Sequence, residues 1–398
     1  MAKNKKLKIL FLSKWYPNKY DEQLGIFVQK HAEAVALYAD VVVLYVVGDP
    51  NLKSKTPILI KIKKENFIAY TYYYNQNTTA FLPLRKLINI TRYWQVSSQA
   101  LKSLFETFGQ PDLVHAHVLN RPAVVAYYIK KRFGISYCIT EHWSGYINGK
   151  FAKKNVLLKA LSRFLVHQSS AFSAVSVALQ NAIKKNGLKR PNYLIENVVE
   201  FKDFDNKKLK KLQKNAKIRF LSIGDLFDKV KNISDVIRVV AKMAKNEKTK
   251  PFEYHIIGGG TDENALKNLA KQLDVLDNCV FFHGRQTNDF VLTFLPSIDF
   301  LIVNSNYETF SVVTAEALAC GKPVIATRCG GPEIFITKEN GLLISPKKPD
   351  ELENAICYMM QNYETYNAEV LAKNIRQTYS KQKIGKDFLQ MYQNVLET

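Results

Sequence analysis

The sequence predicts an α/β protein built from two Rossmann-like, doubly wound domains of similar size, and three observations lead to this prediction. The chain has 398 residues, which is long for a single hydrophobic core. Short apolar runs alternate with longer amphipathic patterns, as is typical of parallel sheets covered by helices. The alternation stops in the polar, lysine-rich stretch 202–217 and then restarts, which indicates a linker between two domains.

The first domain is predicted over residues 1–201. Its expected strands are short runs rich in apolar residues, and its expected helices repeat apolar residues every three or four positions. In chain order these segments are the strand 8–13, the helix 25–39, the strands 40–47 and 112–117, the helix 122–134, the strand 136–142, the segment 170–187 and the run 193–201.

The N-terminus has a basic start followed by a short apolar run, Ile9–Leu12. This run is too short for a signal peptide, and no small-residue cleavage pattern follows it, so we interpret it as the first strand. No window of about 18 apolar residues occurs, so we expect no membrane-spanning segment. The five cysteines form no CxxC pair and are odd in number, as expected of reduced cysteines in a cytoplasmic protein.

The second domain is predicted over residues 218–375, with a C-terminal helix, 376–398, that could cross back to the first domain. Its segments are the strand 218–226, the helix 234–245, the strand 254–260, the helix 264–273, the strand 279–284, the helix 290–297, the strands 299–305 and 341–346, and a helix from about residue 349. Open parallel sheets hold ligands at the carboxyl ends of their strands. A cleft between the two domains is therefore the expected active site.

The net charge of +22 is unevenly distributed. Residues 1–200 contain 29 Lys and Arg against 11 Asp and Glu, so this half carries +18 of the total. A basic half indicates binding to polyanions such as nucleic acids or anionic lipid headgroups, although solubility alone is an alternative explanation. Because no helix-turn-helix, zinc-finger or RNA-binding signature occurs, we do not expect nucleic acid as a partner.

The stretch NSNYETFSVVTAEALACGKPVIATRCGGPEIF (304–335) predicts an anion pocket. A strand ends near Ser305, and a helix is expected to begin at Ser311 as its N-cap and to end at Gly321. The free N–H groups and the dipole at the start of such a helix favour phosphate groups.

Two carboxylates lie in this stretch. Glu316 is expected in the middle of the helix among apolar residues, where a buried charge is costly unless donors such as ribose hydroxyls reach it. Glu308, on the preceding loop, could accept hydrogen bonds from the hydroxyls of a sugar. The alternative is that Glu316 lies on an exposed helix face and Glu308 points into solvent, and composition alone does not decide between the two.

Glycine-rich loops and a lysine accompany this pattern. Gly258-Gly259-Gly260 and Gly330-Gly331 follow expected strands, which allows close backbone approach to a ligand, although a plain turn is the alternative. Lys231 lies on the loop after the first strand of the second domain, where a cation could neutralise a diphosphate. Lys229 could take its place.

Together these residues resemble a known family. The segment NYETFSVVTAEALACGKPVIATRCGGPE is similar to the signature of glycosyltransferase family 4, retaining enzymes of the GT-B fold. That signature has two glutamates separated by seven residues, then EAxAxGxPVI and GGxxE. The similarity extends to IIGGG, FHG and NGLLISP in the second half and to PDLVHAH, TEH and IENVVEF in the first. It implies a GT-B architecture and transfer of a sugar from a nucleoside-diphosphate sugar, with no metal or other cofactor.

The resemblance also implies roles for individual residues. Glu308 would hold the donor sugar, Glu316 the ribose and Lys231 the diphosphate. The backbone amides that would meet sugar and phosphate belong to Phe310, Ser311, Val312 and Val313. The other donor-binding candidates are Gly258, Gly259, Arg285 and Gly25, whose loop would close over the phosphates.

His117 would face the transferred sugar and the acceptor. His142 is a weaker acceptor-site candidate, and the alternative is a histidine of the core or of a hinge. Two positions depart from the family pattern. Asp225 stands where the family commonly has an arginine beside the diphosphate, so it must turn away or leave Lys231 to act without that partner. Ser311 replaces a usual glycine.

Two possible metal motifs are not expected to bind a metal. Asp203-Phe204-Asp205 matches a D-x-D pattern but lies in the predicted linker. His115 and His117 project from one face of a strand, yet no third ligand is spaced to complete a site.

The resemblance also implies that the first domain, which is the basic half, holds the acceptor. The segments 85–105 and 153–166 mix Lys and Arg with large apolar residues at helical spacing, which suits helices lying on an anionic membrane. We therefore expect a glycan or lipid-linked acceptor at the inner face of the plasma membrane, in cell-surface polysaccharide biosynthesis. The alternative is that these helices only cover their own sheet.

Rival functions are a GT-B sugar-nucleotide epimerase, a glycan phosphorylase and a non-catalytic polyanion-binding protein.

Overall fold

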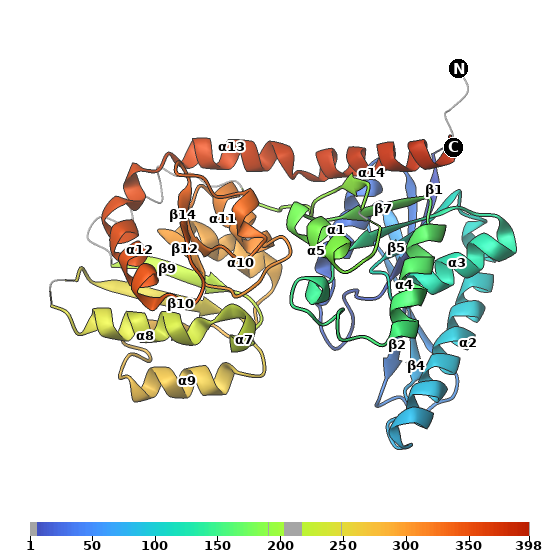
Figure 1. The fold of residues 1–398 in the computed structure, drawn as a ribbon, viewed down its shortest axis with the longest axis horizontal. Helices are drawn as coiled ribbons and strands as arrows, with labels where there is room; N and C mark the ends of the chain where they lie inside the picture. Colours follow the sequence, from blue (N-terminus) through green and yellow to red (C-terminus); the bar gives the residue numbers. More distant parts are fainter. Residues whose placement is uncertain (1–5, 190, 203–216, 248, 398) are drawn as a thin grey trace. The chain divides into compact units, whose positions relative to one another are not determined.

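The computed structural model describes residues 6–189, 191–202, 217–247 and 249–397 and divides into two compact units (Figure 1). Unit 1 comprises Met1–Val198 and Lys381–Thr398, and unit 2 comprises Val199–Ser380. Each unit has a mainly or wholly parallel sheet with helices packed on it, so the predicted fold class is confirmed. Most of the predicted linker, and the D-x-D pattern at residues 203–205, lie outside the described residues.

The sheet of unit 1 has the strand order β3-β4-β2-β1-β5-β6-β7-β8. All neighbouring strands pair in parallel except β3, which is antiparallel to β4. The strands are β1 (Lys8–Ser13), β2 (Asp40–Asp49), β3 (Ile58–Lys63), β4 (Phe67–Asn75), β5 (Leu113–His117), β6 (Tyr137–Glu141), β7 (Ala171–Ala174) and β8 (Tyr193–Leu194).

The hairpin of β3 and β4 was not predicted from the sequence. β3 lies at the edge of the sheet, and every residue in it is exposed or only partly buried. Its alternating lysines therefore give it the composition of a surface loop, and pairing with β4 makes it a strand.

The helices of unit 1 include one that comes from the far end of the chain. They are α1 (Ile26–Val35), α2 (Leu82–Phe108), α3 (Pro122–Phe133), α4 (Val156–Gln168), α5 (Val177–Lys185) and α14 (Lys381–Leu396). α14 packs on α1 at Gly385, where a Cβ atom would lie 2.2 Å from the carbonyl oxygen of Ala34. The expected single helix 376–398 is wrong in detail, because α13 (Ala368–Thr378) ends before α14 begins.

The sheet of unit 2 is entirely parallel, with the strand order β11-β10-β9-β12-β13-β14. Its strands are β9 (Ile218–Ile223), β10 (Phe252–Ile257), β11 (Val280–Phe282), β12 (Phe300–Val303), β13 (Val324–Thr327) and β14 (Gly341–Ile344). Besides α13, its helices are α7 (Asp228–Lys231), α8 (Ile233–Ala244), α9 (Glu263–Gln272), α10 (Asn288–Phe294), α11 (Val312–Ala319) and α12 (Pro349–Asn362).

Both sheets reverse their strand order at one point. In unit 2 the chain winds outward from β9 through β10 to β11, then returns to β12 on the other side of β9. In unit 1 the reversal lies between β1 and β5. Open α/β sheets bind ligands beyond the carboxyl ends of the strands at such a reversal. The residues that follow these strands are therefore where each unit's chemistry is expected.

Candidate active site

The reversal point of unit 2 carries a buried ion pair. Lys231 ends the short helix after β9, and its Nζ donates a hydrogen bond to Oε1 of Glu308, on the loop after β12, at 2.6 Å. The hydroxyl of Ser305 donates to the same oxygen at 2.8 Å. Among the described residues no hydrogen bond reaches Oε2 of Glu308, which leaves that oxygen available to a ligand.

The pair is largely removed from solvent, with side-chain exposures of 19% for Lys231 and 14% for Glu308. Burial alone would lower the pKa of Lys231, but the charge and hydrogen bond of Glu308 raise it above its ordinary value. Lys231 is therefore a firmly held cation at neutral pH.

The loop that carries Glu308 is fixed by its backbone. The N–H of Glu308 donates to the carbonyl of Cys329, and the N–H of Asn306 donates to the carbonyl of Val230. Phe310 is buried, and a Cβ atom at Gly331 would lie 2.7 Å from its carbonyl carbon. Gly331 therefore permits this close approach of the two backbones. The loop is held between the segment at Val230 and the segment at Cys329.

The helix α11 begins one residue after Ser311, as predicted, and ends before Gly321. Ser311 does not cap it through its side chain: its φ is +68°, and its hydroxyl lies 2.8 Å from that of Thr314. The expectation of a serine N-cap is wrong in this respect. The left-handed backbone explains why a glycine is usual at this position. The next two residues, Val312 and Val313, are partly exposed at the start of the helix.

Glu316 lies in the middle of α11 and is only 5% exposed. The alternative that it lies on an exposed helix face is therefore wrong. Burial and then the charge of Glu316 raise the pKa of the neighbouring Cys320 thiol to about 12, so that thiol stays neutral.

The Gly258–Gly260 loop packs against the loop that follows β9. A Cβ atom at Gly258 would lie 1.9 Å from the carbonyl oxygen of Gly224, and one at Gly260 would lie 2.6 Å from that of Leu226. A Cβ atom at Gly259 would lie 3.2 Å from the Cβ atom of Arg285. The first and last glycines are thus required by contact between two backbones within the protein.

Asp225, which departs from the family pattern, points outward and has a cationic partner. Its side chain is 75% exposed, and it accepts a hydrogen bond from Arg285 at 2.9 Å. The guanidinium of Arg285 also lies 3.3 Å from the carbonyl oxygen of Gly259. The structure therefore brings an arginine to this loop from the segment after β11, instead of from position 225.

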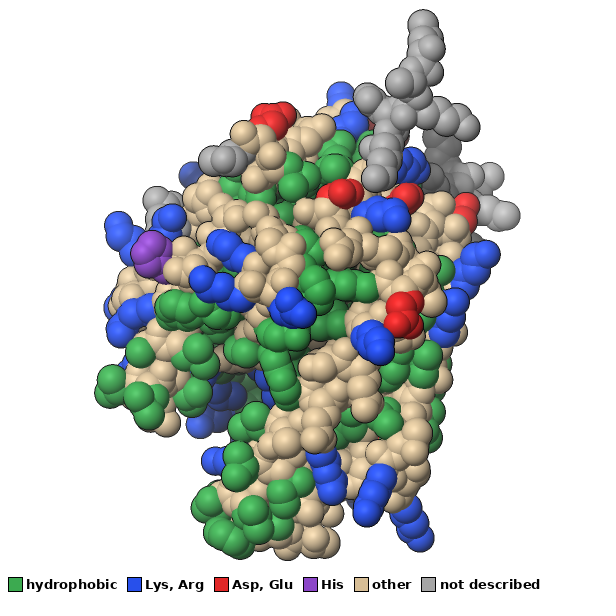
Figure 2. Space-filling model, turned by 90° about the vertical axis from the view of Figure 1, so that its right-hand side faces the viewer, with side chains coloured by type: hydrophobic (Ala, Val, Ile, Leu, Met, Phe, Trp, Pro, Cys, Tyr) green, Lys and Arg blue, Asp and Glu red, His purple; other side chains and the backbone are tan. Residues whose placement is uncertain are grey.

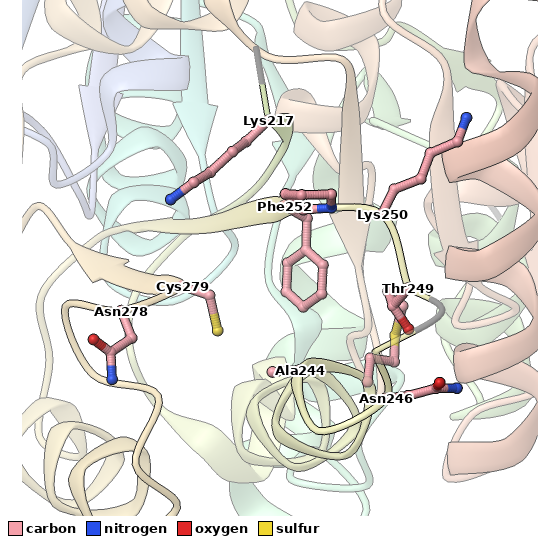
Figure 3. Close-up of a pocket in the computed structure, with 10 residues that line it drawn as sticks. Lys217, Ala244, Asn246, Thr249, Lys250, Phe252, Asn278 and Cys279 are labelled. Carbon is pink, nitrogen blue, oxygen red and sulfur yellow. The ribbon is translucent and has the colours of Figure 1, made fainter. Parts of the chain in front are cut away.

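A hollow of about 210 Å³ in unit 2 lies away from these residues (Figure 3). It is lined by Lys217 and Phe252, at the amino ends of β9 and β10, and by Cys279 before β11. Because it lies at the opposite end of the strands from Lys231 and Glu308, we do not assign the donor to it.

His117 ends β5 in unit 1 and is fully buried. Its Nδ1 lies 3.2 Å from Nε2 of His142, which follows β6. Burial first, and then the neighbouring histidines, hold the pKa of both rings well below the usual range. Both are therefore neutral at physiological pH.

His115 plays a different part from His117. Its two ring nitrogens lie 2.7 Å from the hydroxyls of Tyr392, on α14, and of Thr140, on β6. His115 is therefore fully satisfied in the core, where it joins the C-terminal helix to the sheet.

A third histidine completes a cluster around His117, which corrects the expectation that no further ligand lies near it. Ring nitrogens of His31, on α1, His117 and His142 lie within 4.8 Å of one another. Each of these rings has one buried nitrogen without a hydrogen-bond partner among the described residues. Three neutral imidazoles could hold Zn²⁺ or Cu²⁺. The prediction that the reaction needs no metal stays a prediction.

Gly25 lies in unit 1 at the start of α1, with a φ of +67°. A Cβ atom there would lie 2.2 Å from the carbonyl oxygen of Trp15, so its loop packs against the segment after β1. Sequence reasoning missed Ser305, although it lies only three positions before Glu308. It also missed His31, for which no spacing signal exists because the cluster joins three distant segments.

Two family descriptions match the chain. Residues 189–378 match glycosyl transferases group 1, and residues 40–202 match glycosyltransferase family 4. The chain belongs to glycosyltransferase family 4. It is therefore a glycosyltransferase, and its two Rossmann-like units are those of the GT-B fold.

Individual relatives agree with this assignment. N-acetyl-alpha-D-glucosaminyl L-malate synthase of Bacillus anthracis is 29% identical over 300 residues, 72% of this chain and 75% of that one. Sucrose-phosphate synthase from Thermosynechococcus elongatus superposes with a TM-score of 0.78 at 18% identity, covering 98% and 100% of the two chains. HepE from Anabaena in complex with UDP superposes with a TM-score of 0.71 at 17% identity, again covering 98% of this chain and 100% of that one. At such identities the two structures establish the fold alone.

Proposed function

We propose that this family 4 glycosyltransferase moves a sugar from a nucleoside-diphosphate sugar to a glycan or lipid-linked acceptor, with retention at the anomeric carbon, in cell-surface polysaccharide biosynthesis. The donor assignment rests on one observation, the buried Lys231–Glu308 pair beside the start of α11. The UDP complex of HepE supports a nucleoside-diphosphate donor. Retention is supported by the family resemblance.

The donor would leave a diphosphate as its glycosidic bond breaks. The ammonium of Lys231 and the free N–H groups at the start of α11 would stabilise the charge that develops on this leaving group. Oε2 of Glu308 would accept a hydrogen bond from a sugar hydroxyl, and Glu316 would accept from the ribose. This chemistry uses groups that the chain already carries, and no step in it requires a metal.

On the acceptor side, the hydrogen bond between the neutral rings of His117 and His142 leaves one outer ring nitrogen as an acceptor and the other as a donor, so one of the two rings could accept a hydrogen bond from a sugar hydroxyl. His117 lies at the reversal point of unit 1, where an open sheet is expected to bind its ligand. The cleft between the two units stays a prediction.

We also propose peripheral contact with an anionic membrane through α2 and α4. Both helices expose large apolar side chains: Phe81 just before α2, Leu82, Leu84, Leu87 and Ile90 on α2, and Val156, Leu157, Leu158, Leu161 and Phe164 on α4. α4 contains no acidic residue, and α2 has one, Glu106, near its end. Basic and apolar side chains share the face shown in Figure 2, where acidic ones are few. This combination favours anionic lipid headgroups. No described helix is long and apolar enough to cross a membrane.

Calorimetric titration of UDP, GDP and ADP tests the donor assignment. We expect one nucleotide to bind, and Glu316→Ala to weaken that binding at least tenfold, because a buried acceptor for the ribose hydroxyls is lost. Glu353→Ala is the control, since it removes an acid on α12 that pairs with Lys242. Undiminished affinity in Glu316→Ala would remove the assignment.

Product analysis separates transfer from the rival reactions. With the bound donor and a mixture of acceptor glycans, we expect a new glycosidic linkage. An epimerised nucleotide sugar would indicate an epimerase, and a sugar phosphate formed from a glycan would indicate a phosphorylase.

A further inference from the structure

Two lysines and two tryptophans meet at the carboxyl edge of the sheet of unit 1, and we refer to Lys14, Trp15, Trp143 and Lys154 as the lysine–tryptophan subsite. Nζ of Lys14 lies 4.7 Å from the ring centroid of Trp15 and 5.7 Å from that of Trp143. Nζ of Lys154 lies 4.4 Å from the ring centroid of Trp143. One indole is thus shared by two ammonium groups, and all four side chains are partly exposed.

The positive charge of the subsite is not neutralised by an ion pair, although Nζ of Lys154 donates to the side-chain oxygen of Asn120 at 3.4 Å. Among the described residues, neither lysine lies within 4.0 Å of a carboxylate oxygen. The acid in this region, Glu141, is fully buried and already occupied by neutral donors. These donors are the N–H groups of Leu119, His142 and Trp143 and the hydroxyl of Tyr146, at 2.9 to 3.2 Å.

Burial makes this charge costly. Burial lowers the pKa of Lys14, the charges of Lys154 and Arg121 lower it further, and Glu141 offsets this only in part. The pKa of Lys154 is lowered by burial as well. A bound anion would remove this cost, because an opposite charge favours the protonated form of both lysines.

The backbone around the subsite is strained. Val118, a β-branched residue directly after His117, has a φ of +72°, and Arg121 has a φ of +65°. Such conformations cost of order 1–3 kcal/mol each and cluster at functional sites. A Cβ atom at Gly145 would lie 2.2 Å from the ring of Trp143, so the indole packs directly on the chain. The subsite is therefore a built shape next to His117 and His142.

We propose that the lysine–tryptophan subsite binds a phosphate or diphosphate group on the acceptor, with the indole of Trp143 packing against the adjoining sugar ring. Lysine ammonium groups bind phosphate as point charges, and two of them beside one indole suit a multiply charged group. This inference rests on the proposed function, since it takes unit 1 to hold the acceptor.

Tryptophan fluorescence tests the subsite, because two of the three tryptophans belong to it. Pyrophosphate and glucose 1-phosphate are titrated with the donor site filled by a saturating nucleoside diphosphate. We expect saturable binding that the Lys14→Met/Lys154→Met double variant weakens at least tenfold. Lys153→Met removes the same charge from an exposed neighbour and should leave the affinity unchanged. Equal affinities in the double variant and in Lys153→Met would overturn the proposal.

Two further arms complete the experiment. If the double variant does not fold, Lys154→Met alone should still weaken binding several-fold, and an unchanged affinity would overturn the proposal. The affinity for a sugar on polyprenyl diphosphate, in detergent micelles, is then compared with the affinity for glucose 1-phosphate. Tighter binding of the polyprenyl compound assigns a lipid-linked acceptor, and equal binding assigns a soluble sugar phosphate.

Thermal shift with UDP, GDP and ADP is recorded on the same samples. Its absence counts against the proposed function, whereas a failed phosphate titration counts against the subsite alone.

Discussion

The carboxyl edges of the two sheets have the same topology and different chemistry. In unit 2 the charges are paired, Lys231 with Glu308 and Arg285 with Asp225. In unit 1 the corresponding edge holds neutral histidines, and lysines without a carboxylate partner among the described residues. In open α/β sheets the strand order sets the edge at which ligands bind and the loops set their chemistry, so we expect different ligands at the two edges.

The loops also differ in how they are held. In unit 2, glycines let backbone pack directly on backbone, as at Gly258 and Gly331. In unit 1, Gly25 makes a similar contact with the carbonyl oxygen of Trp15, but side chains also hold the edge, with Glu141 accepting four hydrogen bonds. A single added methyl group should therefore disrupt the edge of unit 2 more than a change of charge disrupts that of unit 1.

Among single substitutions, the largest effect is expected for Gly258→Ala. Its Cβ atom would lie 1.9 Å from the carbonyl oxygen of Gly224, at a φ of +152°. Strain and overpacking together should lower the free energy of unfolding by about 3 kcal/mol or more. Gly284→Ala is the control, because its φ is also positive but nothing lies within 4 Å of the added atom, so about 1 kcal/mol is expected. Chemical denaturation measures both, and equal losses would contradict the backbone contact.

Acid should destabilise unit 1 through its buried histidines. The pKa of His31 falls to about 4 through burial, and those of His115, His117 and His142 are also lowered, mainly by burial. Because the unfolded chain binds protons near pH 6.5 and the folded one does not, their contribution is complete above that pH and is lost as the pH falls. Each histidine should lower the free energy of unfolding by up to about 1.4 kcal/mol for every pH unit below 6.5.

Tryptophan fluorescence follows this loss in unit 1, because Trp15, Trp94 and Trp143 all lie there. Denaturant midpoints at pH 7.5 and 5.0 should differ clearly, and less so in His31→Gln. A midpoint that does not change between the two pH values would show that these rings bind protons in the folded state as readily as in the unfolded chain.

A smaller effect concerns the exposed helices of unit 1. Leu157 is 80% exposed on α4, beside lysines that would attract anionic lipid. We expect Leu157→Ser to reduce salt-sensitive flotation with phosphatidylglycerol-containing vesicles about tenfold, since one buried leucine contributes about 1.5–3 kcal/mol. Val370→Ser, at a 62% exposed position of unit 2, should leave flotation unchanged. Flotation that depends on neither lipid charge nor salt would reject the proposal that α2 and α4 bind an anionic membrane.

Removal of metal should have no effect. Dialysis against a chelator should leave both transfer and nucleotide binding intact, because side chains and backbone supply the charges of the proposed donor site. If the chelator instead removed activity, if Zn²⁺ restored it, and if Zn²⁺ failed to restore it in His31→Gln, a metal would be assigned to the histidine cluster.

Much of the fold follows from the sequence because its patterns are long and local. The alternation of apolar runs and helical patterns predicted both Rossmann-like units, and the bounds of α11 followed from Ser311 and Gly321. The burial of Glu316 was only one of two alternatives, since a helix of eight mostly small or apolar residues has no polar face to set its orientation.

The remaining features depend on contacts between distant segments. The cluster of His31, His117 and His142 joins α1, β5 and the segment after β6, and no spacing rule connects them. The pairing of Arg285 with Asp225 likewise crosses two loops that follow different strands. Such sites arise from packing, so the sequence provides their residues without their partners.

Hydrogen exchange on the whole chain tests the central claim most directly, namely that the reversal point of unit 2 binds the nucleoside diphosphate through Lys231. The nucleotide found by calorimetry should slow exchange in peptides covering residues 304–319, both in the unaltered protein and in Lys229→Met, which loses an exposed lysine two positions away. The same nucleotide should give no such protection in Lys231→Met. Unchanged exchange over 304–319 in the unaltered protein, or full protection in Lys231→Met, would contradict the account.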